Sequence, residues 1–235
     1  MAEGSNIAGG TGNLQRTVVL GLARLQIIVM LLIFIPAGTL HFWQGWLFSM
    51  IFLASVVLLT FYFLKRDPHL IENRMEAGPG AEQQRNQKII QAFTGTMAIA
   101  LVVVPGLDHR FHWSSVPAPI VILADAVIVL GFLIIYRVFR ENSFAAGTIK
   151  VEAEQRVIST GPYRLVRHPM YAGGALLLFA TPPALGSLWG LAVAVAINAG
   201  IVVRLLDEER YLSANLPGYD AYCREVTCRL VPLVW

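Results

Sequence analysis

Long apolar runs alternate with polar segments along the chain. A helix needs roughly 20 apolar residues to cross a hydrocarbon core about 30 Å thick. In the first part of the chain, the runs of that length are Thr17–Gly38, Trp43–Leu64, Ile89–Leu107 and Val116–Tyr136. Short turns join the first run to the second and the third to the fourth. This pattern predicts two antiparallel hairpins of transmembrane helices.

Two further apolar runs follow, Met170–Leu185 and Leu188–Leu206. The first of them is interrupted by Pro182 and Pro183 and is barely long enough to cross the core. The sequence therefore leaves open whether there are five or six full spans, and whether the last two runs instead form a re-entrant hairpin.

Composition agrees with this pattern. Hydrophobic residues make up 56% of the chain and charged residues 14%, against roughly 25% charged in soluble domains. The predicted fold class is an all-α membrane protein with about six apolar helical segments. A chain of 235 residues with this many spans has no room for a separate soluble catalytic domain. Any active site therefore has to be built from helix ends and loops.

The polar segments divide the chain into three predicted parts. Residues 1–16 are Gly-rich and predict a flexible tail, residues 17–136 hold four transmembrane helices, and residues 137–235 form a catalytic region with a C-terminal cap. Asp67 followed by Pro68 signals the start of a short helix on the membrane surface. The segment Thr148–Thr160 reads as two short β-like runs and predicts a flap.

The basic residues indicate the orientation, because segments rich in Lys and Arg stay in the cytosol. With the N-terminus in the cytosol, every Lys and Arg except Arg110 falls on the cytosolic side. The residues at the opposite interface include Trp43, Trp46, Trp113 and Trp189, as in an aromatic belt. The net charge of +3 therefore follows from topology and indicates no nucleic-acid partner.

Two charges lie inside predicted spans, Arg24 in the first and Asp125 in the fourth. At 1.5 Å per residue their depths differ by roughly 6 Å or less. They predict either a buried ion pair, or an arginine that reaches the surface and an aspartate bonded to a neighbouring hydroxyl.

The candidate chemistry lies in two segments at the predicted cytosolic surface, GPYRLVRHPMYAGG (161–174) and RLLDEERYL (204–212). By composition alone, the first segment fits an interfacial belt of aromatic and basic residues equally well. The second segment contains three consecutive acids, Asp207, Glu208 and Glu209, for which topology offers no reason. The acids therefore favour a functional site.

Helical spacing assigns these acids different partners. Arg204 precedes Glu208 by four residues, which places both on one helix face and predicts an ion pair, or only a surface pair of little energy. Glu209 is rotated about 140° from Arg204 and faces another partner. Elsewhere, Cys223 and Cys228 have poor spacing for zinc and no neighbouring histidine, so we predict structural thiols and no metal site.

The two segments, followed by LPGYDAYC and RLVP, resemble the isoprenylcysteine carboxyl methyltransferase family and its bacterial relatives. The likeness covers roughly Asn142–Pro232, with a weaker one in DPHLIENRMEAGPG (67–80). It implies a multi-span membrane transferase that uses S-adenosylmethionine to methylate a lipophilic substrate. No Gly-rich dinucleotide fingerprint is present, which fits a cofactor held by helix ends and loops.

The resemblance also implies site residues. Its cofactor-binding positions fall on Tyr163, Arg167, His168, Pro169, Tyr171, Gly173, Glu208 and Pro232, with Tyr219 and Tyr222 in the segment that closes over the cofactor. Its catalytic Arg and Glu fall on Arg204 and Glu209.

The acceptor is open at this stage. A prenylcysteine-like carboxylate is favoured, since it is ionised at neutral pH and needs only an arginine such as Arg204 to orient it. A phospholipid amine would have to lose a proton, for which Glu209 is the candidate base. A small thiol, an NADPH-dependent sterol-type reductase (whose family shares the RHPxY segment) and a membrane scaffold are the other hypotheses. The expected partners are membrane lipid and a lipophilic small molecule, and the oligomeric state is open.

Overall fold

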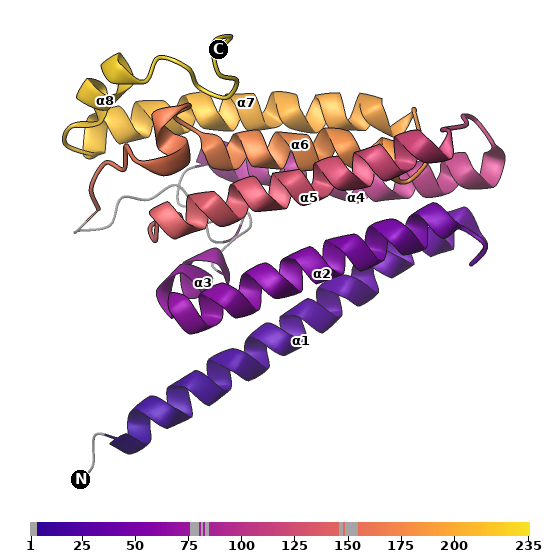
Figure 1. The fold of residues 1–235 in the computed structure, drawn as a ribbon, viewed down its shortest axis with the longest axis horizontal. Coiled ribbons are helices and arrows are strands. Elements are labelled where there is room, and N and C mark those ends of the chain that lie inside the picture. Colours follow the sequence, from indigo (N-terminus) through magenta and orange to yellow (C-terminus); the bar gives the residue numbers. More distant parts are fainter. Residues whose placement is uncertain (1–3, 76–79, 81, 83–84, 146–147, 149–154) are drawn as a thin grey trace.

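The chain folds into a bundle of long helices that run side by side (Figure 1). The computed structural model describes the chain except residues 1–3, 76–79, 81, 83–84, 146–147 and 149–154, and except the side chains of residues 4–13. The described residues contain helices and no strand, so the predicted all-α class is confirmed. The helices long and apolar enough to span a membrane are α1 (Gly4–Ala37), α2 (Trp43–Arg66), α4 (Arg85–Phe111), α5 (Ala118–Glu141) and α7 (Gly190–Asn215).

The sixth apolar run forms α6 (Pro169–Ala184), which lies between α5 and α7 (Figure 1). Its 16 residues give a length of about 24 Å, less than the hydrocarbon core. Because α5 and α7 both end at the same end of the bundle, the chain between them has to return to the opposite end, and α6 makes that passage (Figure 1). The structure thus has five full-length spans among its described residues and one shorter helix that runs with them.

Two glycines bring α5 and α6 into close contact. A Cβ atom on Gly131 would lie 2.9 Å from the carbonyl oxygen of Gly173, and one on Gly173 would lie 3.1 Å from the carbonyl oxygen of Gly131. The hydrophobic effect does not drive helices together inside a bilayer, because the lipid tails are as apolar as the side chains. Close approach of the two backbones at small residues is therefore a main source of packing energy between the helices. This contact places the start of α6 beside the last turns of α5.

Short elements gather at the end of the bundle where α2 and α5 end and where α4 and α6 begin. They are α3 (Pro68–Met75), the 3₁₀ turn η1 (Gly161–Arg164) and α8 (Tyr219–Glu225) (Figure 1). The start of α3 is as predicted, since Asp67 Oδ1 accepts a hydrogen bond from Leu70 N at 3.1 Å.

A buried carboxylate joins the loops at the opposite end. Asp108 is 1% exposed, and its oxygens accept hydrogen bonds from the backbone N of Ser114 at 2.7 Å, from Ser114 Oγ at 2.6 Å and from Ser187 Oγ. These bonds tie the α4–α5 connection to the α6–α7 connection. Because a buried carboxylate needs such donors, the network specifies how the two hairpins dock.

Other predictions have mixed outcomes. Within the described residues, neither carboxylate oxygen of the buried Asp125 has a hydrogen-bond partner, so neither the pair with Arg24 nor the alternative bond to a neighbouring hydroxyl forms. The predicted flap lies partly outside the described residues, and residues 155–160 form no strand. Helix α1 begins at Gly4, inside the segment predicted as a tail, and the three-part division of the chain stays a prediction.

Gly173 and Gly174 provide a matched test of the α5–α6 contact. Gly173→Val is expected to lower the free energy of unfolding by about 2 kcal/mol, because the added carbons meet the α5 backbone. Gly174→Val is the control, since a Cβ there has nothing within 4 Å. Thermal unfolding in nanodiscs measures both variants, and equal midpoints would contradict the proposed packing.

Candidate active site

The two segments singled out in the sequence meet at the end of the bundle that carries α3 and α8. His168 precedes α6 as its N-cap residue, and Pro169 opens the helix, a position where its missing N–H costs nothing. The last turns of α7 run beside this start of α6 (Figure 1). The C-terminal segment 227–232 crosses the same region.

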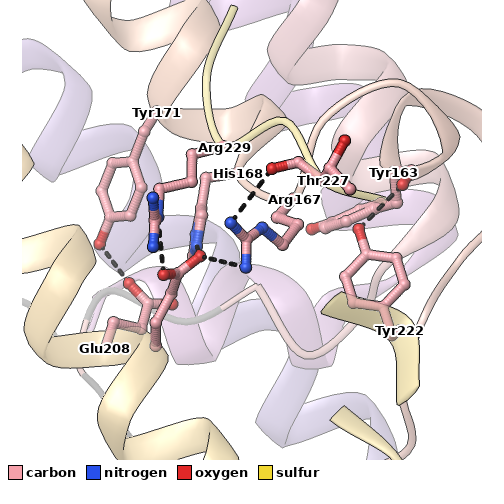
Figure 2. Close-up of polar contacts among 9 residues, drawn as sticks. Tyr163, Arg167, His168, Tyr171, Glu208, Tyr222, Thr227 and Arg229 are labelled. Atoms are coloured by element: carbon pink, nitrogen blue, oxygen red, sulfur yellow. Dashed lines mark hydrogen bonds and ion pairs between the residues drawn. The ribbon is translucent and has the colours of Figure 1, made fainter. Parts of the chain in front are cut away.

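Glu209 of α7 is the centre of a buried ion cluster. Its side chain is 11% exposed. Its Oε1 atom lies 3.1 Å from Arg167 Nη1 and 3.3 Å from His168 Nε2, and its Oε2 atom accepts from Arg229 Nε at 2.8 Å (Figure 2). Charge-assisted bonds to both oxygens compensate for burying this carboxylate. The prediction that Glu209 faces a partner other than Arg204 is confirmed.

Backbone hydrogen bonds tie the C-terminal segment to the same place. Arg167 N donates to Cys228 O at 2.9 Å, and His168 N donates to Arg229 O at 3.0 Å. The Arg167 side chain adds a bond from Nη2 to Thr227 O at 3.3 Å (Figure 2). Glu209 and these bonds together join α6, α7 and the C-terminal segment.

Glu208 and Arg204 are linked through Tyr171 instead of pairing directly. The Tyr171 hydroxyl donates to Glu208 Oε2 at 2.6 Å and accepts from Arg204 Nε at 3.1 Å (Figure 2 shows the bond to Glu208). The predicted ion pair between Arg204 and Glu208 is therefore wrong. The tyrosine of α6 reaches between them because α6 packs against α7 at this point.

The acid that pairs with Arg204 is one that the sequence analysis missed. Arg204 Nη2 lies 2.8 Å from Glu82 Oε1, and Nη1 donates to Gln87 Oε1 at 2.9 Å. The Glu82 side chain is 1% exposed, and Gln87 is fully buried and also bonds Asp207. The available signal was the weaker likeness in residues 67–80, which stops just before Glu82.

A cavity opens between η1, the start of α6, the end of α7 and α8. Tyr163 is held in its wall by two bonds, from Tyr222 Oη to its carbonyl oxygen and from Asn142 Nδ2 to its hydroxyl, both 2.8 Å. Burial raises the pKa of Tyr163 to about 12, so its phenol stays protonated at any physiological pH. This wall is rigid and partly aromatic.

Two polar atoms at the cavity lack partners. The Tyr219 hydroxyl and the Arg167 Nε atom are buried and, within the described residues, accept or donate no hydrogen bond, although both residues line the cavity. A buried donor without a partner is costly, and a polar ligand in the cavity would satisfy it.

The cavity gathers most of the predicted cofactor residues. They are Tyr163, Arg167, His168, Pro169, Tyr171 and Glu208, together with Tyr219 and Tyr222. Gly173 instead packs on α5, and Pro232 lines a separate apolar groove. Arg204 and Glu209 do not line the cavity and lie behind Tyr171 and His168, respectively.

Comparison with known proteins gives one family. Residues 119–216, from α5 to the end of α7, match the phospholipid methyltransferase family. No curated protein matches the chain. The match favours a methyltransferase over the reductase and scaffold hypotheses. Over residues 119–216 the chain is thus similar to the phospholipid methyltransferase family, which belongs to the isoprenylcysteine carboxyl methyltransferase-type superfamily. It is a membrane methyltransferase that uses S-adenosylmethionine to methylate a lipophilic substrate.

Proposed function

We propose that this enzyme methylates the amine of a membrane phospholipid, with Glu208 as the carboxylate that holds the ammonium group and accepts its proton. One observation carries the proposal. Glu208 lines the cavity, and within the described residues it has a single hydrogen-bond partner, Tyr171. An anionic group at this position attracts an amine and repels a carboxylate.

The arginine expected to orient a carboxylate is already engaged. Arg204 is bonded to Glu82, Gln87 and Tyr171. Binding a substrate carboxylate would require breaking a buried pair with Glu82, which is strongly unfavourable. The prenylcysteine-like acceptor favoured by the sequence is therefore less well supported than the amine.

The cavity also has a cation for the phosphate of such a headgroup. Arg156 lines the cavity and is exposed, whereas Glu208, on α7, lines it and is half-buried. A zwitterionic headgroup carries a phosphate and an ammonium group, which match this arginine and this carboxylate. The family's name, phospholipid methyltransferase, supports the same substrate class.

S-adenosylmethionine, when bound, supplies a methyl group on a positively charged sulfur. We propose that the residues holding it are those lining the cavity, with Arg167 Nε and the Tyr219 hydroxyl as the donors that await a partner. His168 and Pro169 form the wall at the start of α6. The aromatic side chains of Tyr163 and Tyr222 exclude water, which favours displacement by the amine over hydrolysis.

The catalytic roles predicted for Arg204 and Glu209 stay predictions, and their contacts favour positioning roles. Arg204 fixes the Tyr171 hydroxyl, which in turn orients Glu208. Glu209 fixes Arg167, His168 and the C-terminal segment. Both oxygens of Glu209 are engaged, so a general base is better placed at Glu208.

We further propose that the active site faces the cytosol. The positive-inside distribution supports this, because Arg110 is alone among the Lys and Arg residues that the structure describes in lying toward the other end of the bundle. The interfacial tryptophans Trp43, Trp113 and Trp189 lie at that other end. The polar cofactor then arrives from water and the lipid substrate from the bilayer.

Glu208→Gln tests the proposed base. The substitution keeps the size of the side chain but removes its charge, so kcat for phosphatidylethanolamine methylation is expected to fall by roughly 100-fold or more. Binding of S-adenosylhomocysteine, measured by calorimetry, changes much less. Glu225→Gln at the exposed end of α8 is the control. Full activity of the Glu208 variant would show that another group receives the proton.

Glu82→Gln tests whether a residue outside the family-matched region positions the site. Loss of the charge that holds Arg204 is expected to lower kcat by about tenfold, because Tyr171 and Glu208 lose their fixed orientation. Arg204→Lys should act in the same direction, and the double variant should be no worse than the worse single one. Additive losses would mean that the two residues act independently.

Tyr219 and Tyr222 form a matched pair for the cofactor site. Tyr219→Phe removes a hydroxyl that is unpartnered among the described residues, so stability should be unchanged while affinity for S-adenosylhomocysteine falls roughly fivefold. Tyr222→Phe removes the bond to Tyr163 O and should lower the thermal midpoint. If Tyr219→Phe binds the ligand normally, the cofactor does not use that hydroxyl.

A further inference from the structure

An apolar groove lies on the other side of the segment that walls the cofactor cavity. It has a volume of about 480 Å³ and runs between α5, η1, the start of α6 and the C-terminal segment. Its lining is mostly apolar and includes Leu133, Leu165, Ala172 and Leu230. Leu133 is 55% exposed and Leu165 is 65% exposed, so the groove opens outward from the bundle.

The groove is lined by one cation, Arg137, among its described residues. Arg137 lines it near the end of α5, and within the described residues it has no acidic partner. The nearby Glu141 is engaged, since Oε2 accepts from Thr160 Oγ1 at 2.7 Å. This end of the bundle carries nearly all the Lys and Arg residues, as expected at the depth of lipid headgroups.

The inner wall of the groove includes the C-terminal segment, which is hydrogen-bonded to Arg167 and His168. Leu230 and Pro232 line the groove. They come one and three residues after Arg229, and the carbonyl oxygens of Cys228 and Arg229 accept from Arg167 N and His168 N. Pro169 lines both the groove and the cofactor cavity. A molecule in the groove would therefore contact the C-terminal segment, which contributes Arg229 to the Glu209 cluster.

We propose that a resident membrane phospholipid, which is not a substrate, occupies this groove. One acyl chain lies along the apolar walls, and the phosphate pairs with Arg137. Charge complementarity and the depth of the groove at the headgroup level identify a phospholipid as the occupant. Bound there, the lipid holds the C-terminal segment against Arg167 and His168, which line the cavity, and raises the affinity for the cofactor.

Photo-crosslinking locates the lipid directly. The full chain is placed in phosphatidylcholine nanodiscs doped with a phosphatidylcholine that carries a diazirine on its acyl chain, a lipid with no amine left to methylate. After irradiation, mass spectrometry should find label enriched at Leu133 and Leu230 relative to Leu123, which is 64% exposed on the same helix as Leu133. If the amount of label on each residue depends only on how exposed that residue is, the proposal is wrong. This outcome does not depend on which substrate the enzyme methylates.

Arginine variants of α5 test the coupling to the cofactor. Arg137→Gln should lower crosslinking in the groove and weaken S-adenosylhomocysteine binding by about threefold, as expected for an exposed charge pair. Arg140→Gln is the matched control, because Arg140 lies on the same turn but packs over the Tyr136 ring, outside the groove. Equal affinities of the two variants would show that the groove does not communicate with the cavity.

Discussion

The site depends on neutralising the buried carboxylate of Glu209. Without the charges of Arg167 and Arg229 and the bond to His168, a carboxylate with 11% exposure would be too costly to keep ionised among packed helices. Those partners come from two separate parts of the chain and Glu209 itself from a third, so meeting this requirement also brings the three parts together. The start of α6, the end of α7 and the C-terminal segment therefore assemble around one anion, and the cavity proposed to hold the cofactor lies beside it.

The adjacent residues Glu208 and Glu209 of α7 have different partners. Consecutive positions on α7 point about 100° apart. Glu209 consequently faces the structural cluster, while Glu208 faces Tyr171 and the cavity. One turn earlier, Arg204 faces α4 and meets Glu82. The family-matched residues 119–216 thus contain Glu208, Glu209 and Arg204, and the preceding connection between α3 and α4 supplies Glu82, the acid that pairs with Arg204.

The fold was largely predictable, because a long apolar run indicates a transmembrane helix. A start signal such as Asp67 before Pro68 likewise indicates a short surface helix. Helical spacing also predicted that Glu209 points away from Arg204 and faces a different partner. The partner of Arg204 was not, since i,i+4 spacing favours Glu208 and the true partner lies 122 positions away in a segment with no periodic pattern. The surroundings of Gly173 were not predictable for a related reason: a small residue permits close approach, but the sequence does not say whether its neighbour is a cofactor or, as in this structure, the backbone of α5.

The central claim is that the acceptor is a lipid amine held by Glu208. It is tested most directly by offering the purified enzyme, in one vesicle, an amine phospholipid and a prenylated cysteine with a free carboxylate, with S-adenosylmethionine carrying a labelled methyl group. An N-methyl product survives alkali, whereas a methyl ester is hydrolysed and releases volatile methanol. The account predicts that the label stays non-volatile on the headgroup nitrogen after alkaline treatment, which removes the acyl chains of the phospholipid but not the N-methyl group. Release of the label as methanol would contradict it and restore the carboxylate as the acceptor.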